Sequence, residues 1–270
     1  MIPEKQIKLI RGLDQLNIPT YTEMIWPLPY ETVDTFLEGI DQIIDIGLTN
    51  WLDVNPLTMF AGTELYQDFG DKVGFVSKCS DNVPASQKET VNILVNKTEW
   101  ASNDDIVQGQ VLYAWIMCLY FFGFARPLIN AIKEKHNQSV TKTVKNFVQW
   151  LEANPDAKFA SAQQRLKSRW KSWLTGEPAI NLSIFPEHDT DYWKPHSHLA
   201  SWLRQDAQGF YQDLQRFANT QNIDHTTDLD FDSIVEFPGK FNNLFEFCRY
   251  YYWWRRMTGE HRKKLSTNLV

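Results

Sequence analysis

Carboxylate and carboxamide side chains interrupt two short stretches that otherwise have the composition of strands. Glu23 lies in a run rich in β-branched and aromatic residues, and Asp53 and Asn55 lie in a second such run. Successive residues of a strand point to opposite faces, so Glu23 shares a face with Ile25, and Asp53 shares a face with Asn55. This pattern leaves two interpretations open. The polar face is a ligand site, or it is a set of internal polar groups that satisfy one another or an arginine elsewhere.

The densest group of potential metal ligands is a histidine-rich segment. His188, His196 and His198 lie near Asp189 and Asp191. The closest histidine pair has HxH spacing, whereas zinc sites favour HxxxH on a helix or CxxC pairs. Such a pair in a loop is more typical of a solvated turn than of a metal site, and a substrate-facing loop is the other interpretation.

The cysteines give no sign of a metal centre or of a disulfide framework. Cys79, Cys118 and Cys248 are far apart and form neither a CxxC nor a CxxxCxxC motif. We therefore expect no metal site and a reducing, cytoplasmic location. The N-terminus shows no apolar signal segment, and the longest apolar run, Val111 to Phe124, is too short to span a bilayer. A membrane partner is not expected.

The C-terminal tail mixes aromatic residues with cations over residues 249–256 and 262–264. Such mixing can bind single-stranded nucleic acid through base stacking and phosphate contacts. A net charge of −6 and a pI of about 5.5 argue against that role. A buried helical face, with arginine stems covering aromatic rings, is the favoured interpretation, and we expect no nucleic-acid partner.

The polar face belongs to a predicted strand–helix–strand unit. The first strand covers residues 20–26 and ends at Pro27, because a proline cannot donate to a sheet ladder. Thr32 can cap the helix, Gly47 ends it, and the second strand covers residues 51–55. One helical face is apolar and consists of Val33, Phe36, Leu37, Ile40, Ile43 and Ile44. Two strands joined through a helix should be parallel neighbours.

The segment around the first turn resembles a known family. Its sequence is Ile25-Trp26-Pro27-Leu28-Pro29-Tyr30-Glu31-Thr32, followed by Phe36, Gly39 and Gly47. It is similar to the fifth-strand region of radical S-adenosylmethionine (SAM) enzymes, and most similar to the branch that also binds cobalamin. Ile25 and Glu31 match that family, whereas Glu23, Pro27 and Tyr30 stand where the family has glycines. Residues 55–57 and 62–65 fit the sixth strand and the loop after it, so the resemblance covers about residues 4–66.

The resemblance implies that residues 1–66 are the last strands and helices of a partial TIM barrel. Radical SAM enzymes hold a [4Fe–4S] cluster with three cysteines of a CxxxCxxC motif, and this chain has no such motif. We therefore expect a C-terminal fragment or subunit whose partner is the missing N-terminal half of the barrel. SAM, the [4Fe–4S] cluster and, in this branch, cobalamin would be cofactors of the complete enzyme. The chain alone is expected to bind none of them.

The complete enzyme would cleave SAM to a 5′-deoxyadenosyl radical, with methylation or ring formation on a small molecule or peptide as the outcome. By resemblance, Ile25 would pack against the adenine of SAM. Asn55, Asp53 and Glu23 would face SAM or the substrate. Pro27 and Glu31 would shape the turn, with Glu31 accepting backbone N–H groups.

The expected fold class is α/β, followed by a mainly α-helical C-terminal region. We divide the chain into a barrel part (1–66), an irregular connecting segment with a short strand or hairpin (67–102) and a helical region (103–270). Helices are predicted from residue 103 and over 4–17, 127–136, 140–153, 158–174, 196–220 and 232–258. The alternative fold is a three-layer α/β unit that covers its own sheet edges with the C-terminal helices. The alternative function is a non-enzymatic α-helical interaction protein.

Overall fold

The computed structural model describes residues 4–16, 21–47, 51–60, 62–78, 92–175, 196, 199–200, 202–203 and 206–223. Its strands are β1 (Tyr21–Trp26), β2 (Trp51–Pro56), β3 (Thr58–Met59), β4 (Val73–Lys78) and β5 (Asn92–Thr98). Its helices are α1 (Glu4–Gln15), α2 (Val33–Asp45), α3 (Glu64–Phe69), η1 (Gly70–Lys72), α4 (Asn103–Ile116), η3 (Met117–Phe121), α5 (Arg126–His136), α6 (Val140–Ala153), α7 (Ala160–Leu174) and α9 (Ala207–Thr220).

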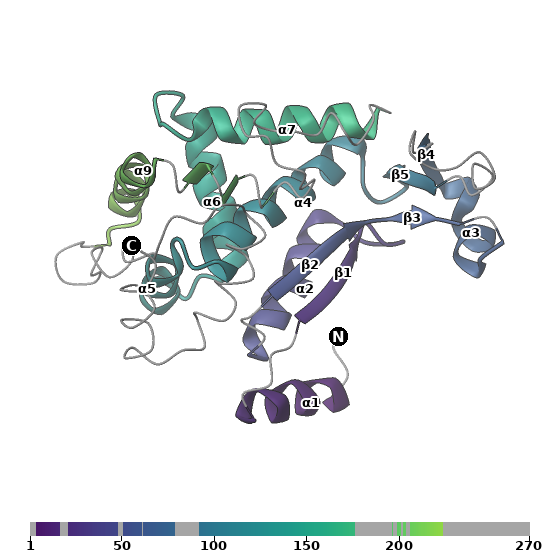
Figure 1. The fold of residues 1–270 in the computed structure, drawn as a ribbon, viewed down its shortest axis with the longest axis horizontal. Helices are drawn as coiled ribbons and strands as arrows, with labels where there is room; N and C mark the ends of the chain where they lie inside the picture. Colours follow the sequence, from purple (N-terminus) through teal and green to yellow (C-terminus); the bar gives the residue numbers. More distant parts are fainter. Residues whose placement is uncertain are drawn as a thin grey trace, which may run out of the picture.

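The predicted strand–helix–strand unit is confirmed. β1 and β2 pair in parallel, and α2 connects them (Figure 1). Thr32 caps α2 by accepting a hydrogen bond from the backbone N–H of Thr35, and Gly47 follows the helix with a φ of 98°, a conformation that favours glycine. All six residues of the predicted apolar face of α2 are buried. The unit therefore forms for the local reasons that the sequence suggested.

A second, small sheet of three strands lies at one end of the molecule, with α3 beside it (Figure 1). Its order is β3–β5–β4, and both pairings are antiparallel. The sequence predicts a short strand or hairpin within residues 67–102, and β4 and β5 form an antiparallel pair there. This sheet has its own small core of Leu57, Met59 and Val95.

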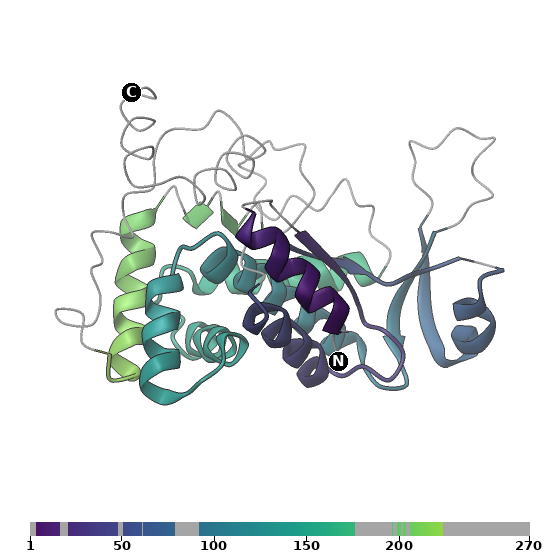
Figure 2. The same cartoon turned by 90° about the horizontal axis from the view of Figure 1, so that it is seen from below.

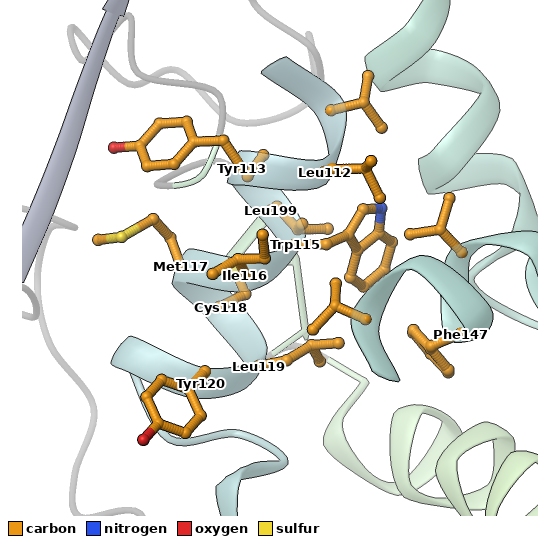
Figure 3. Close-up of a cluster of buried hydrophobic side chains, with 14 of the residues drawn as sticks. Leu112, Tyr113, Trp115, Ile116, Met117, Cys118, Leu119, Tyr120, Phe147 and Leu199 are labelled. Atoms are coloured by element: carbon orange, nitrogen blue, oxygen red, sulfur yellow. The ribbon is translucent and has the colours of Figure 1, made fainter. Parts of the chain in front are cut away.

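Helix α4 and the π-helix η3 that continues it form the centre of the helical region. Every residue from Val107 to Phe122 except Gln108 is buried, so this segment is enclosed on all sides. Trp115 points toward Phe147 of α6, whereas Tyr113, Met117 and Tyr120 point away on the opposite side of the helix (Figure 3). One side of the α4–η3 segment therefore packs against other helices, and Tyr113 on the opposite side reaches β2.

The remaining helices surround α4. Helix α7 lies along one side of it, and α5, α6 and α9 gather at the end far from the small sheet (Figures 1 and 2). A continuous hydrophobic core runs from α2 and the parallel strands through α4 to α6, α7 and α9. The division of the chain into parts at residues 66 and 102 stays a prediction. This core contains buried residues from before residue 66 and from after residue 102.

The helices predicted from residue 103 and over 127–136 are confirmed, with α5 beginning one residue earlier than predicted, whereas the single helix predicted over 196–220 is wrong. The helix that begins at residue 103 ends in a π-helical turn, and Gly123 follows with a φ of 86°. Pro127 lies in the first turn of α5 and begins that helix, because its missing N–H is not needed there. The helix predicted over 196–220 is interrupted. The described residues 196, 199–200 and 202–203 are helical, and a separate helix, α9, begins at Ala207, where Asp206 caps it by accepting from the Gly209 N–H. The helix predicted over 232–258 lies outside the described residues.

Helix α1 confirms the prediction over 4–17 except at its end, but its apolar side is largely uncovered. Ile10 is buried, whereas Leu9 and Leu16 are 60% and 70% exposed. Over the residues that the structure describes, no single helix is both long and apolar enough to cross a bilayer. Two consecutive helical segments, Asn103–Phe121 and Arg126–His136, would together be long and apolar enough to cross a bilayer. They are bent by 96° relative to each other.

A candidate ligand-binding face on the parallel strand pair

The four residues predicted to face a ligand lie together on one face of the parallel pair. Glu23 is directly opposite Asp53, and Ile25 is directly opposite Asn55. Glu23 and Ile25 are exposed, and Asp53 and Asn55 are half-buried. Two carboxylates and a carboxamide thus surround one apolar side chain. No result tests whether they bind a cofactor, so that role stays a prediction.

The opposite face of the same strands packs against α2. Leu52, Val54 and Trp26 are buried there. The indole of Trp26 stacks on Phe36 of α2, with ring centroids 4.7 Å apart. Because α2 packs on this face, the polar face is the one left for another molecule or another part of a protein.

The turn after β1 is fixed by Glu31. Pro27 follows a cis peptide bond at the end of the strand. The Glu31 carboxylate accepts a hydrogen bond from the Leu28 N–H at 3.0 Å, and the Glu31 N–H donates to the Leu28 carbonyl oxygen. Burial raises the pKa of Glu31, and the Leu28 hydrogen bond opposes this rise. The Glu31 carboxylate therefore stabilises the backbone of its own turn.

Tyr30, the residue that stands in place of a family glycine, adopts a φ of 66°. Such a conformation is uncommon for a bulky residue and needs support from its surroundings. The Tyr30 ring packs against Trp100 at 4.3 Å and against Phe69 at 5.7 Å between centroids. These contacts join the turn to the loop before α4 and to α3, next to the carboxyl end of β1.

Tyr113 of α4 reaches the polar face from the edge of β2. Its hydroxyl group lies 3.1 Å from Asp53 Oδ1 and 3.2 Å from the Leu52 carbonyl oxygen, both of which can accept its proton. Burial and the nearby negative charge of Asp53 raise the pKa of Tyr113 well above its ordinary value, while a hydrogen bond with the Val54 backbone lowers it. Tyr113 therefore stays protonated, orients the Asp53 carboxylate and covers the outer edge of β2.

The outer edge of β1, on the other side of the strand pair, has no such cover among the described residues. The Leu57 N–H donates to the Trp26 carbonyl oxygen, which shows that the backbone groups of Trp26 point toward β2. The N–H and C=O groups of successive strand residues point in alternating directions, so the N–H and C=O groups of Glu23 and Ile25 point away from β2. Within the described part of the chain no third strand pairs with β1.

His196 is the one member of the histidine-rich segment that the structure describes. It is buried beside Tyr113, with ring centroids 5.3 Å apart, and its carbonyl oxygen accepts a hydrogen bond from Cys118 Sγ. His188 and His198 lie outside the described residues. Among those that are described, no three histidine, cysteine, aspartate or glutamate side chains gather in a way that could hold a metal ion.

Sequence reasoning missed two residues of this region, Tyr113 and Gln110. Both lie on α4, about 60 residues after β2, so no local pattern connects them with Asp53. One signal was available for Gln110. It is a carboxamide within a buried helical stretch, where polar side chains are uncommon unless they have a partner.

The donor set of the polar face fits part of a nucleoside ligand. The half-exposed Ile25 offers an apolar surface for a purine ring, and Asp53 and Asn55 offer acceptors and a donor for hydroxyl or amino groups. The set does not fit an iron–sulfur cluster, because the described residues include no group of cysteines; Cys79 and Cys248 lie outside them.

Comparisons with known proteins link the chain to one class of enzyme. No family model matches it. Over 243 residues it is 25% identical to a 2-(S-pantetheinyl)-carbapenam-3-carboxylate methyltransferase of Streptantibioticus cattleyicolor and 21% identical to the cobalamin-dependent radical SAM methyltransferase TokK of Streptomyces tokunonensis. Each match covers 82% of this chain and 35% of the relative. The chain is thus a distant relative of a radical SAM methyltransferase and spans about a third of the length of the relatives it matches.

Proposed function

We propose that this chain is the C-terminal part of a cobalamin-dependent radical SAM methyltransferase and works together with a barrel half that carries the CxxxCxxC motif. The observation that carries the proposal is the relation to two methyltransferases over 82% of the chain. In this arrangement β1 and β2 are the last strands of the barrel, and the helical region follows them.

The open edge of β1 supports the proposal. An unpaired strand edge presents free N–H and C=O groups and invites pairing with another strand. Tyr113 covers the outer edge of β2, but the described residues provide no equivalent cover for the outward backbone groups of Glu23 and Ile25. A further barrel strand would satisfy these groups and continue the sheet.

The uncovered side of α1 supports the same partner. Leu9 of this helix and Leu16, the residue that follows it, are mostly exposed, although an amphipathic helix normally buries such residues against a sheet. In a (β/α) barrel each helix packs on its neighbouring strands. The preceding barrel strand would therefore have two roles: it would cover the apolar side of α1, and it would also pair with β1.

The chain's own residues would bind and orient the reactants. Ile25 would pack against the adenine of SAM, and Asp53 and Asn55 would hydrogen-bond to SAM or substrate at the carboxyl ends of the strands, where barrel enzymes have their active sites. SAM, bound to a [4Fe–4S] cluster in the partner half, supplies the radical chemistry. The substrate class to test first is a carbapenam carboxylate with an S-pantetheinyl group, which is named for one relative.

The experiment combines this chain with the polypeptide from the same genome that carries CxxxCxxC and the preceding barrel units. After reconstitution of the cluster, 5′-deoxyadenosine and methylated product are measured by mass spectrometry with methyl-labelled SAM. The chain alone should form neither product, and the pair should form both. A chain that does not bind this polypeptide, and that forms neither product when combined with it, would contradict the proposal and favour the non-enzymatic interaction protein.

A matched pair of variants tests the open edge. Ile25→Pro removes an N–H that points away from β2, so the β1–β2 ladder should stay intact. Ile25→Val keeps this N–H. We expect Ile25→Pro to retain the circular dichroism of the chain but to weaken its binding to the barrel half at least tenfold, while Ile25→Val binds as the original chain does. Equal binding by both variants would exclude pairing along β1.

A further inference from the structure

Gln110 of α4 is a buried carboxamide without a hydrogen-bond partner. It is 1% exposed, and within the described part of the chain neither its Nε2 nor its Oε1 makes a hydrogen bond. Gln163 of α7 is buried to a similar degree, but it accepts from Trp115 and donates to Glu152. Because an unsatisfied buried polar group destabilises a fold, Gln110 requires an explanation that Gln163 does not.

Two contacts locate Gln110 along the strand pair. It lies four residues after Ile106 and three residues before Tyr113, so all three lie on neighbouring turns of α4. Trp26, the last residue of β1, donates from Nε1 to the Ile106 carbonyl oxygen at 3.2 Å. Tyr113 meets β2 at Leu52 and Asp53. Gln110 is therefore level with the carboxyl ends of the strands, between these two contacts.

The direction of Gln110 follows from helix geometry. With 3.6 residues per turn, it lies about 60° from Tyr113 around α4, on the side toward Cys118. Cys118 and Tyr113 both contact His196, which identifies this side of the helix as the one next to His196. Tyr113 also reaches Asp53, whose side chain is on the face opposite α2. Gln110 thus flanks the polar face near Asn55.

We propose that Gln110 binds an amide group of the substrate at this face. A carboxamide has two donors and an acceptor and no charge, so its natural complement is another amide. The carboxylates of Glu23 and Asp53 on the same face disfavour an anionic group at this position. The proposal rests on the proposed function, because it places the substrate on the inner side of the barrel. Since Gln110 is enclosed, its surroundings must move locally when the amide enters.

The test uses S-methylpantetheine, a small molecule with two secondary amides, and pantoate, which has no amide, as the control ligand. Isothermal titration compares the 270-residue chain with Gln110→Met, a substitution of similar size, and with Gln108→Met. Gln108 is exposed on the same helix and serves as the matched control. We expect the original chain and Gln108→Met to bind S-methylpantetheine equally, and Gln110→Met to bind it about tenfold more weakly. Pantoate should not bind.

Thermal melting of the same proteins separates binding from stability. Gln110→Met should raise the melting temperature, because it removes a buried unpaired amide. A raised melting temperature with unchanged binding, or no binding of S-methylpantetheine by the original chain at millimolar concentration, would overturn the inference.

The same measurements distinguish this inference from the proposed function. Amide binding through Gln110 without methyl transfer by the assembled pair contradicts the proposed reaction and leaves the binding site standing. Methyl transfer that Gln110→Met leaves unchanged contradicts the binding site and leaves the reaction standing.

Discussion

Tyr113 joins the helical region to the strand pair through one hydroxyl group. This group lies within hydrogen-bond distance of the Leu52 carbonyl oxygen and of Asp53, and the ring packs beside His196. It therefore covers a strand edge and orients a carboxylate of the candidate site at the same time. Nothing else among the described contacts links α4 to the polar face so directly.

Removal of this hydroxyl group should destabilise the chain. Tyr113→Phe removes the buried hydroxyl donor that lies against the Leu52 carbonyl oxygen and Asp53, at a cost of about 1–3 kcal/mol in the free energy of unfolding. Urea unfolding measures this change. Tyr66→Phe is the control, because Tyr66 is half-buried and no hydrogen bond of its hydroxyl group is seen in the described structure. Equal effects of the two substitutions would contradict the role given to Tyr113.

At the scale of elements, α4 approaches the parallel strands at a glycine. A Cβ atom on Gly109 would overlap the indole ring of Trp26, whose Nε1 donates to Ile106 in the same helix. The close approach lets one helix contact β1 and β2 while it packs against α6 and α7. The absence of a side chain at residue 109 thus helps to set the distance between the strand pair and the helical region.

Two glycine substitutions on helices should have opposite effects. Gly109→Ala forces α4 and Trp26 apart and should lower the free energy of unfolding by about 1–3 kcal/mol. Gly12→Ala on α1 meets no atom within 4 Å and should raise it by about 0.5–1 kcal/mol, because alanine favours the helix. Both values can be measured by urea unfolding followed by circular dichroism. Stabilisation by Gly109→Ala would rule out the close approach.

For the whole molecule, the continuous core makes the strand pair and the helical region one cooperative unit. Unfolding in urea should therefore give coincident transitions by tryptophan fluorescence and by far-ultraviolet circular dichroism. The small sheet has a separate core of three buried residues and should exchange its backbone amide protons faster than β1 and β2 do. Two separate transitions, or equal protection of both sheets, would show that the cores are organised differently.

Local sequence patterns alone predict the strand–helix–strand unit and the residues that share its polar face. These features depend on local rules. Alternation along a strand places Glu23 with Ile25 and Asp53 with Asn55, and the helical period gives α2 its buried face. Thr32 and Gly47 mark the helix ends through their own backbone and side-chain chemistry. The resemblance around residues 25–32 also pointed to the enzyme class of the distant relatives.

Only the tertiary structure decided which parts of the chain meet this face. Tyr113 lies 60 residues from Asp53, and Trp26 lies 80 residues from its acceptor Ile106. No local pattern encodes such distances, because they depend on how a helix that is buried on almost all sides orients itself in the core. Within the described residues, the same packing leaves Leu9 and the outer edge of β1 uncovered and encloses Gln110 without a hydrogen-bond partner. Burial and pairing belong to the assembled molecule, so these features appeared only in three dimensions.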